Sequence, residues 1–406
     1  MKNLCIATFS LVLNGKRTPI NGMIEPLLSF FLQRTNHIDL IDGAHPGSSI
    51  ALTTFETYSG GILQRSSYSW SSVLLSPLLS MQNSGGTRTS FKIRDILGVF
   101  ELFIRQRTTY DLFIGIESIY TICGIILRYF GRARRVVYYV SDYAPNRYGT
   151  LFLKDIYLWL DRFCCYHADF IWDVSPAMLP ARKKAGLNSK RCKPVILVPN
   201  ALFPEQITYL PEKKLKNMSI VFAGTFGLEN GTKLLIETMR VVVQKIPDVT
   251  LHFYGGNKEQ EAFLMKLTKS YHLEQNIVFH GLITNTIELS RQISHFMVGI
   301  APYLALPGSP RWYADATKIR LYMGSGLPVI TTHVPPLGSM VAKKGAAIVV
   351  KDNKLALSDA ILHLLTDKAY YRKMRKNAID YIKENTWEKT YSDALSQMGI
   401  GASGHV

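Results

Sequence analysis

In the second half of the chain, a predicted strand and the helix after it are separated by glycines and polar residues. The apolar run 219–223 (SIVFA) ends at Gly224 and Thr225, and the next helical pattern starts near Asn230. Backbone N–H groups at a helix start point outward, and the helix dipole favours an anion there. Glycine also lets the backbone approach a ligand closely. The pattern predicts an anion-binding turn, with a plain strand-to-helix turn as the alternative.

A lysine lies in the first turn of another predicted helix, at 317–325. Lys318 places a point charge there that can hold a phosphate group. Its alternative is a solvated surface lysine beside Arg320. Two roles stay open for Asp315, just before this helix: it accepts hydrogen bonds from ligand hydroxyl groups, or it caps the helix.

In the first half of the chain, two carboxylates and a glycine follow predicted strands. Asp142 and Glu117 each come at the end of an apolar run, and Gly15 follows the first such run. Open α/β sheets bind ligands at the carboxyl ends of their strands. A carboxylate there can orient a hydroxyl group or accept its proton. The alternatives are an ion pair of Asp142 with Arg147, a structural role for Glu117 and a plain turn at Gly15.

Strands that alternate with helices must position these residues. In the second half, apolar runs predict strands at 219–223, 249–256, 277–281, 296–303, 327–332 and 346–350. In the first half, they predict strands at 5–13, 37–43, 110–116, 135–143, 169–175 and 195–201, and a hairpin or loops within 45–90. Short, nearly all-apolar strands between helical patterns indicate a parallel sheet that is covered on both faces. The fold class is therefore α/β, with a Rossmann-like sheet in each half.

The chain is long enough for two domains. A length of 406 residues exceeds what one hydrophobic core usually serves. Two prolines and a run of charges mark 203–217 as the linker. We therefore expect an N-terminal Rossmann-like domain at 1–205 and a C-terminal one at 206–386. The C-terminal helix, within 387–406, is expected to return to the first domain.

The chain is strongly basic. Its 47 Lys and Arg residues exceed its 30 Asp and Glu residues, for a net charge of +17. This surplus indicates an anionic partner, such as nucleotide phosphates, lipid headgroups or nucleic acid. Two basic groups stand out: Arg128, Arg132, Arg134 and Arg135 with Tyr129 and Phe130, and Arg182, Lys183, Lys184, Lys190, Arg191 and Lys193. They suit an anionic membrane surface, or they form a solvated face. Because no zinc finger, RNA-recognition signature or basic helix repeat is found, we expect no nucleic-acid partner.

Cysteines and apolar runs indicate the compartment. The five cysteines have no CxxC and no paired Cys/His spacing, which favours reduced thiols over disulfides or a zinc site. The first residues, MKNLCIATFSLVLNG, are similar to a signal peptide but lack a small-residue cleavage pattern, so we interpret them as a first strand. The apolar stretch 112–130 is too interrupted for a membrane span. We expect a cytoplasmic protein without a metal, soluble or peripheral on the inner face of the cell membrane.

Several segments resemble glycosyltransferase family 4. In residues 313–332 (YADATKIRLYMGSGLPVITT), the family's D-P-x-K-x-x-E-Y-x-A-x-G-x-P-V-V pattern is matched at Asp315, Lys318, Tyr322, Gly326, Pro328 and Val329. Residues 219–239 are similar to the first strand, loop and helix of the family's C-terminal domain. VYYVSDYAPNRY (137–148) is similar to a landmark of its N-terminal domain. The resemblance is poor before residue 100.

The resemblance implies the GT-B fold, in which two Rossmann-like domains face each other across a cleft. It implies an enzyme that moves a sugar from a UDP- or GDP-sugar to a saccharide or lipid-linked acceptor, in the synthesis of a cell-surface glycan such as lipopolysaccharide. The reaction is expected to retain the anomeric configuration and to need no metal or cofactor. The donor-binding candidates are Gly15, Gly224, Thr225, Asn230, Asp315, Lys318 and Tyr322, and the candidate catalytic residues are Asp142 and Glu117.

Three positions depart from the family pattern. Leu321 replaces the glutamate that holds the donor ribose. Thr225 replaces an arginine or lysine, and Asn230 replaces the lysine of the usual Lys-Gly helix start. A degenerate homologue without catalysis therefore stays open. A sugar-nucleotide epimerase of the same fold is a second alternative.

Overall fold

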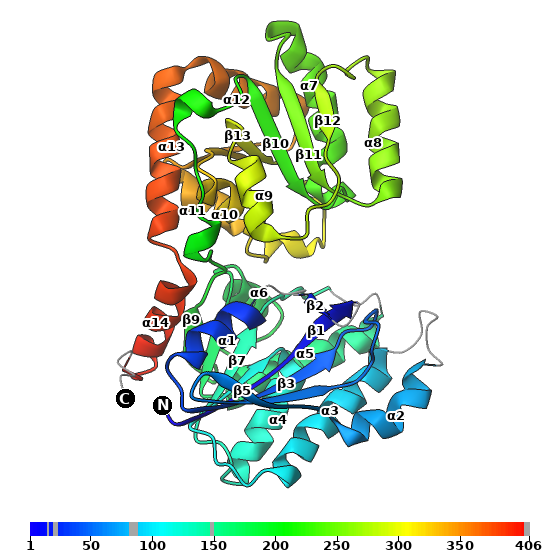
Figure 1. Cartoon of the computed structure of the whole chain (residues 1–406), viewed down its shortest axis with the longest axis vertical. Coiled ribbons are helices and arrows are strands. Elements are labelled where there is room, and N and C mark those ends of the chain that lie inside the picture. The colour runs from blue at the N-terminus through cyan, green and yellow to red at the C-terminus, as the bar shows by residue number, and fades with distance from the viewer. Residues whose placement is uncertain (14–15, 19–22, 81–87, 147–149, 402–406) are drawn as a thin grey trace. The chain divides into compact units, whose positions relative to one another are not determined.

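The computed structural model describes residues 1–13, 16–18, 23–80, 88–146 and 150–401 (Figure 1). The chain divides into two compact units. The N-terminal unit comprises Met1–Pro199 and Tyr391–Val406, and the C-terminal unit comprises Asn200–Thr390. The predicted linker 203–217 lies within the C-terminal unit, because the division falls a few residues earlier in the chain.

The N-terminal unit is built on one sheet, in the order β5-β4-β3-β1-β6-β7-β8-β9 with β2 beside β1. The strands are β1 (Asn3–Leu13), β2 (Lys16–Thr18), β3 (His37–Ala44), β4 (Thr54–Ser59), β5 (Ile62–Tyr68), β6 (Leu112–Ile116), β7 (Val136–Val140), β8 (Phe170–Asp173) and β9 (Val195–Leu197). From β3 through β1 to β9, neighbouring strands pair in parallel. β4 and β5 form an antiparallel hairpin, which confirms the hairpin predicted within 45–90.

Helices connect these strands. They are α1 (Ile24–Leu32), α2 (Trp70–Ser80), α3 (Arg88–Arg105), α4 (Ser118–Tyr129), α5 (Leu151–His167) and α6 (Met178–Lys184). α4 packs closely on β6 at Gly115, which has no side chain. A Cβ there would lie only 2.5 Å from the backbone N of Thr121 in α4. The apolar stretch 112–130 is thus a strand followed by a helix. Within the described ranges, no helix is long and apolar enough to cross a membrane.

The last helix, α14 (Trp387–Gln397), returns to the N-terminal unit as predicted. The ring of Tyr391 lies 5.4 Å from that of Phe30 and 6.2 Å from that of Trp172. Arg135 donates a hydrogen bond to the carbonyl oxygen of Met398 at 3.1 Å. These contacts anchor the C-terminal segment on the first sheet.

The C-terminal unit is built on an all-parallel sheet, in the order β12-β11-β10-β13-β14-β15. The strands are β10 (Ser219–Gly224), β11 (Thr250–Gly255), β12 (Ile277–Phe279), β13 (Val298–Ala301), β14 (Val329–Thr332) and β15 (Ala347–Val350). The helices are α7 (Thr232–Lys245), α8 (Lys258–Ser270), α9 (Thr286–Ile293), α10 (Thr317–Gly324), α11 (Pro336–Ala342), α12 (Lys354–Thr366) and α13 (Lys368–Lys383), with 3-10 turns η1 (Pro204–Gln206), η2 (Glu212–Lys214), η3 (Leu228–Asn230) and η4 (Pro310–Trp312). Two apolar core clusters contain alternate residues of β10, Phe222 in one and Val221 in the other. Side chains that alternate along a strand point to opposite faces, so this sheet is covered on both faces as predicted.

Each sheet has one place where the strand order reverses. In the C-terminal unit the order runs outward from β10 to β12 on one side and from β13 to β15 on the other. In the N-terminal unit the reversal lies between β1 and β6. Loops after the strands diverge at such a point and leave a crevice at the carboxyl ends, which is where open α/β sheets bind ligands.

Candidate functional site

The turn between β10 and α7 reaches the reversal point of the C-terminal sheet. Gly224 ends β10 with φ at 142°, and a Cβ there would lie 3.1 Å from Nζ of Lys318. Gly231, with φ at 66°, precedes α7, and a Cβ there would collide with the carbonyl oxygen of Pro302, just after β13. Glycine at both positions lets the two strand ends and the helix start approach each other. The first turn of α7 has no side-chain cap, an arrangement that suits an anion.

Lys318, in the first turn of α10, reaches the same place. Its Nζ donates to Oδ1 of Asn230 at 3.0 Å. Nδ2 of Asn230 in turn donates to Oγ1 of Thr225 at 2.9 Å. Four of the predicted donor residues, Gly224, Thr225, Asn230 and Lys318, therefore form one group, which we call the lysine cluster.

The ammonium group of Lys318 lies in a partly apolar setting. It is 4.4 Å from the ring centroid of Phe222 and 4.9 Å from that of Tyr303. Burial lowers the pKa of Lys318 well below its usual value, and the positive charge of Arg311 lowers it further. A bound anion has the opposite effect, because it stabilises the ammonium form. The electrostatics of the lysine cluster thus favour an anionic ligand.

Arg311 and Glu229 border the lysine cluster, and the sequence analysis missed both. Nε of Arg311 lies 3.8 Å from Oε2 of Glu229 and has no hydrogen-bond partner among the described residues. The same carboxylate accepts a hydrogen bond from Oγ of Ser309 at 2.6 Å. The Ser-Pro pair before Arg311 is a helix-start signal, and it is the feature of the sequence that could have drawn attention to this turn.

Asp315 does not cap α10, which was one of its two predicted roles. Its carboxylate accepts from Nε and Nη2 of the buried Arg320 at 3.0 Å each, and from the N–H of Asn200 at 2.8 Å. α10 begins after Ala316 and has no side-chain cap. The carboxylate is therefore committed to a buried ion pair that joins the chain after β9 to the start of α10.

Tyr322 supports the lysine cluster from within the core and presents nothing to a ligand. Its side chain is fully buried. Its hydroxyl accepts from the N–H of Ala223 at 2.7 Å and donates to the carbonyl of Ile300 at 3.1 Å, so it ties the ends of β10 and β13 together. The neighbouring Leu321 packs against the core. As an apolar side chain, it cannot accept the ribose hydrogen bonds of the family's glutamate.

In the N-terminal unit, Glu117 lies at the reversal point of the sheet. It follows β6 directly and precedes α4, with φ at 69° and ψ at 167°. Only glycine adopts this conformation readily, and another residue held there stores about 1–3 kcal/mol of strain. The carboxylate accepts from the N–H of Ser141 at 3.2 Å and from its Oγ at 2.6 Å. Such strain persists where surrounding structure enforces it, and it is commonest at functional sites.

Of the other predicted residues of this unit, the structure describes only Asp142. Asp142 follows Ser141 after β7 and is half-buried, near the carboxyl end of the sheet as predicted. Gly15 and Arg147 lie outside the described residues, and with them the proposed turn and the proposed ion pair. Glu117 follows β6 and Asp142 follows β7, and these two strands are parallel neighbours in the sheet.

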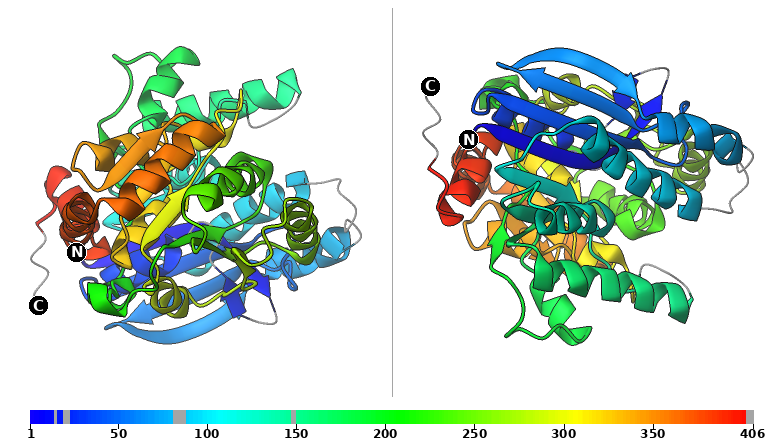
Figure 2. Two further views of the ribbon diagram at one scale, coloured as in Figure 1. Left: turned by 90° about the horizontal axis from the view of Figure 1, so that it is seen from above. Right: turned by 90° about the horizontal axis from the view of Figure 1, so that it is seen from below.

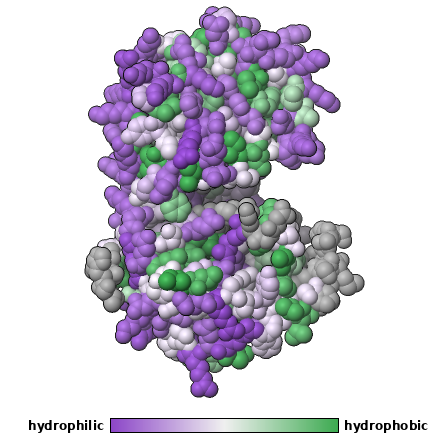
Figure 3. All heavy atoms as spheres, in the orientation of Figure 1, coloured by the Kyte–Doolittle hydropathy of each residue, from purple (hydrophilic) through white to green (hydrophobic). Residues whose placement is uncertain are grey.

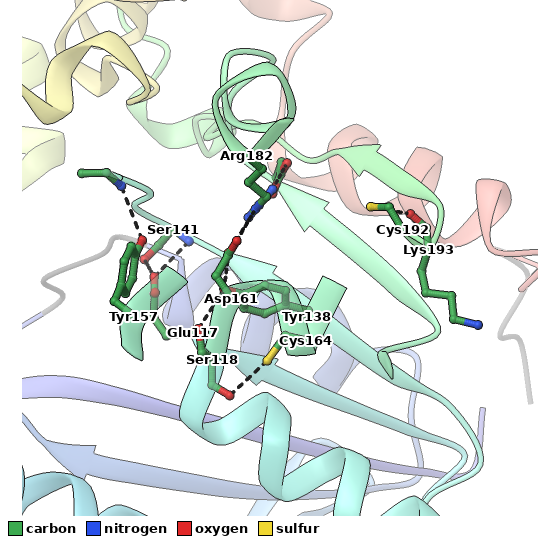
Figure 4. A network of polar contacts seen from close by, with 12 residues as sticks. Glu117, Ser118, Tyr138, Ser141, Tyr157, Asp161, Cys164, Arg182, Cys192 and Lys193 are labelled. Atoms are coloured by element: carbon green, nitrogen blue, oxygen red, sulfur yellow. Dashed lines mark hydrogen bonds and ion pairs between the residues drawn. The ribbon is translucent and has the colours of Figure 1, made fainter. Parts of the chain in front are cut away.

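A buried network holds this edge of the sheet in place (Figure 4). Arg182 donates from Nε to both oxygens of Asp161 at 3.0 Å and from Nη1 to Asp173 at 2.6 Å. Asp161 accepts from the hydroxyl of Tyr138 at 2.9 Å, which in turn lies 2.9 Å from Oγ of Ser118, the residue after Glu117. The network joins α5, α6, β7 and β8 to the start of α4.

Arg182 therefore corrects the prediction of a second basic surface group. It is 1% exposed and neutralised by two carboxylates. In the first basic group, Arg128 pairs with Asp169 at 2.6 Å, and Arg132 donates to backbone carbonyls. Lys183, Lys184, Lys190, Arg191 and Lys193 remain exposed.

Another polar cluster that the sequence did not reveal lies near the carboxyl ends of β1 and β3. Arg17 donates from Nε to Asp42 at 2.6 Å and from Nη2 to Glu56 at 2.9 Å. Oγ of Ser10 donates to the same Asp42 oxygen at 2.6 Å. Burial raises the pKa of Asp42, against the lowering effect of Arg17. No motif marks these residues, since they come from separate segments. Over the described ranges, no group of three or more His, Cys, Asp or Glu side chains is arranged to hold a metal ion.

Comparisons with known proteins agree with this arrangement. The sucrose-phosphate synthase of Thermosynechococcus elongatus superposes with a TM-score of 0.69 at 15% identity, covering 98% of both chains. HepE of Anabaena, in complex with UDP, superposes with a TM-score of 0.66 at 14% identity, covering 98% of this chain and 100% of that one. The two Rossmann-like units define the GT-B class of fold.

The match to a known family lies within the C-terminal unit. Residues 217–367, which include the lysine cluster, match the family described as glycosyl transferases group 1. The Bacillus subtilis protein YtcC, which is named as a glycosyltransferase, is 26% identical to this chain over 172 residues. That alignment covers 40% of each chain, so it spans less than half of this relative. The match to this family covers less than half of the chain.

Proposed function

We propose that this protein is a glycosyltransferase that moves a sugar from a nucleotide-diphosphate sugar to a saccharide or lipid-linked acceptor. The observation that carries the proposal is the lysine cluster. Its lysine and two helix starts without side-chain caps meet at a reversal point of the sheet, within the residues that match glycosyl transferases group 1. A diphosphate is the anion that this chemistry would recognise.

The proposed reaction breaks the bond between the sugar and the diphosphate. Negative charge grows on the leaving phosphate oxygen, and fixed cations or N–H groups directed at it lower the barrier. Lys318 supplies one cation and Arg311 a second beside it. We propose that these protein groups neutralise the leaving group, as expected for a reaction that needs no metal.

We propose a UDP-sugar as the donor, because HepE, a structural neighbour, is known in complex with UDP. Since the apolar Leu321 cannot accept hydrogen bonds from the donor's ribose, we propose that another side chain accepts them. Glu229 is a candidate, because its carboxylate lies beside Arg311 at the edge of the cluster. Family 4 membership and retention of configuration remain expectations from the resemblance.

In the N-terminal unit, we propose Glu117 as the leading catalytic candidate and Asp142 as the second. Glu117 combines a strained backbone with a position at the reversal point of its sheet. A carboxylate there can orient the acceptor hydroxyl or stabilise the cationic sugar. We propose that the product is a cell-surface glycan and that the enzyme works in the cytoplasm.

Thermal shifts with UDP, GDP, ADP and their sugars test the donor class, because a ligand of the folded state raises its stability. Release of the nucleoside diphosphate that depends on an added saccharide or lipid-linked acceptor tests transfer. Conversion of UDP-GlcNAc to an epimer without an acceptor would instead favour the epimerase. No response to any nucleotide would favour the degenerate homologue and end the proposal.

A further inference from the structure

Large apolar side chains are exposed on the N-terminal unit more than on the C-terminal one. Figure 3 shows broad apolar areas on the visible face of the N-terminal unit. Outside that view, they gather on the first half of α5: Leu151 (79% exposed), Phe152 (73%), Leu153 (46%), Ile156 (39%) and Trp159 (57%). Soluble proteins rarely expose such a contiguous apolar group unless it meets a partner.

Apolar side chains continue as a stripe along the helix, from the exposed Phe152 to the half-buried Phe163. Phe152, Ile156, Trp159 and Phe163 are spaced by four, three and four positions, which places them on one helical face. Trp159 stacks on Phe163 at 5.7 Å, and Phe163 stacks on His167 at 4.4 Å. Figure 2 shows α5 on the outside of the N-terminal unit in both views, with its first end extending beyond the neighbouring elements.

The other end of this stripe is surrounded by positive charge. Arg128 donates to the carbonyl oxygen of His167 at 2.8 Å, and the guanidinium of Arg191 lies 4.6 Å over the ring of Tyr166. The N–H of Lys193 donates to the carbonyl oxygen of Cys165, so all three basic residues meet the end of α5, where Asp169 pairs with Arg128. The segment 174–199, which holds Arg191 and Lys193, contains no Asp or Glu. Apart from the exposed Asp155, this helix face thus changes from apolar at its start to basic at its end.

We propose that α5 is a membrane-docking helix that lies along the surface of an anionic phospholipid bilayer. Its first half would enter the acyl boundary, with Trp159 at the interface where tryptophan is favoured. The basic end would meet the headgroups, where each cation contributes on the order of 1 kcal/mol.

Two other occupants fit the surface less well. A second copy of the chain that paired through α5 in a parallel fashion would bring two basic ends together. A nucleic acid would neutralise the basic end but leave the leucines and Phe152 in water. Docking of α5 does not rest on the proposed transfer reaction, because it can be measured without donor or acceptor.

Flotation of the full chain with vesicles tests the proposal. The native protein should bind vesicles of phosphatidylcholine with added phosphatidylglycerol more tightly than pure phosphatidylcholine. The double substitution Leu151→Asp and Phe152→Asp should weaken this binding at least about tenfold, since two apolar side chains are lost from the acyl boundary. Aspartate in the first turn of a helix is favourable, so α5 should persist. Phe263→Asp, at a phenylalanine of α8 that is 57% exposed, is the matched control.

The basic end and Trp159 provide independent measurements. Lys190→Glu with Arg191→Glu should reduce binding to anionic vesicles at low salt, whereas Lys258→Glu with Lys354→Glu should not. Lipids with brominated acyl chains should quench part of the tryptophan fluorescence of the native protein. This quenching should be lost in Trp159→Phe. The proposal is overturned if the native protein does not bind anionic vesicles, or if the Leu151/Phe152 variant binds them equally well. It is also overturned if that variant instead converts a dimer to a monomer, or if only nucleic-acid binding responds to the charge reversal.

Discussion

Lys318 is the residue on which the proposed donor binding depends most. Lys318→Met removes the ammonium group and keeps most of the side-chain length. Because a hydrogen bond to a charged group is worth about 1.5–3 kcal/mol, we expect UDP to bind about 10- to 100-fold more weakly. Isothermal titration calorimetry measures the change. Lys258→Met, at the exposed start of α8, is the control, and an equal loss in both variants would contradict the assignment.

The depressed pKa of Lys318 predicts the pH dependence of that binding. In the free protein, a rising pH removes the Lys318 proton before ordinary lysines titrate. A bound diphosphate favours the charged form, so UDP should bind with proton uptake and more weakly as pH rises. Calorimetry in buffers of different ionisation enthalpy measures the proton uptake. Lys318→Met should show none, and equal uptake in that variant would place the titrating group elsewhere.

His252 gives the stability of the C-terminal unit its own pH dependence. Its Nδ1 lies 2.9 Å from Nε2 of His280. Burial, then the charges of His280 and Lys216, lower the pKa of His252 from 6.5 to about 4. As pH falls below 6.5, the unfolded chain gains a proton that the folded chain accepts only near pH 4. The free energy of unfolding of the C-terminal unit is therefore unaffected by this histidine above pH 6.5. It falls by about 2 kcal/mol, a figure reduced for solvent screening, as pH drops from 6.5 to about 4.

Chemical denaturation across this window measures the effect. His252→Phe should flatten the slope of unfolding free energy against pH, because the group that titrates is gone. The same change at the exposed His295 should leave the slope intact. A slope that survives in His252→Phe would assign the effect to other groups.

At the scale of elements, the approach of α7 to β13 depends on Gly231. Gly231→Ala forces a Cβ into the carbonyl of Pro302 at a φ of 66°. Gly281→Ala imposes a similar φ of 72° but meets no atom within 4 Å. We expect Gly281→Ala to cost about 1 kcal/mol from the backbone alone, and Gly231→Ala to cost several times more. Thermal unfolding of both variants compares them, and equal costs would show that the close approach does not matter.

The sequence predicts elements of this kind well, because short apolar runs between glycines carry most of the information. The runs 249–256 and 277–281 contain β11 and β12 with only their ends misplaced. Gly224, Asn230 and Lys318 could be predicted to share a site because each lies at a strand or helix end. Parallel strands bring such ends to one edge of the sheet.

Side-chain partners could not be predicted, because they come from distant parts of the chain. Asp315 matches a family motif, yet its carboxylate is held by Arg320 and by Asn200, 115 residues away. Arg182 lies in a basic run but is buried between two carboxylates. The backbone strain at Glu117 has no sequence signal, since glutamate does not mark a positive φ.

At the scale of the whole molecule, two units with separate cores predict two unfolding transitions. Arg182 belongs to the N-terminal unit. Arg182→Met leaves Asp161 and Asp173 buried without a counter-charge, at a cost of about 3–5 kcal/mol. Calorimetry should therefore show one transition lowered by Arg182→Met and the other lowered by Gly231→Ala. If both substitutions lower the same transition, the division of stability between the units is wrong.

The two unfolding transitions can also show which unit binds the donor. A ligand at 100 times its Kd stabilises the folded state that binds it by about 2.7 kcal/mol. Because every residue of the lysine cluster belongs to the C-terminal unit, UDP should raise the transition that Gly231→Ala lowers. The rise should persist in Arg182→Met, whose defect lies in the other unit. In Lys318→Met it should shrink to about 0.4–1.4 kcal/mol at the same UDP concentration. A rise confined to the transition that Arg182→Met lowers would move the donor to the N-terminal sheet, where Arg17 and Glu117 would then be the residues to test.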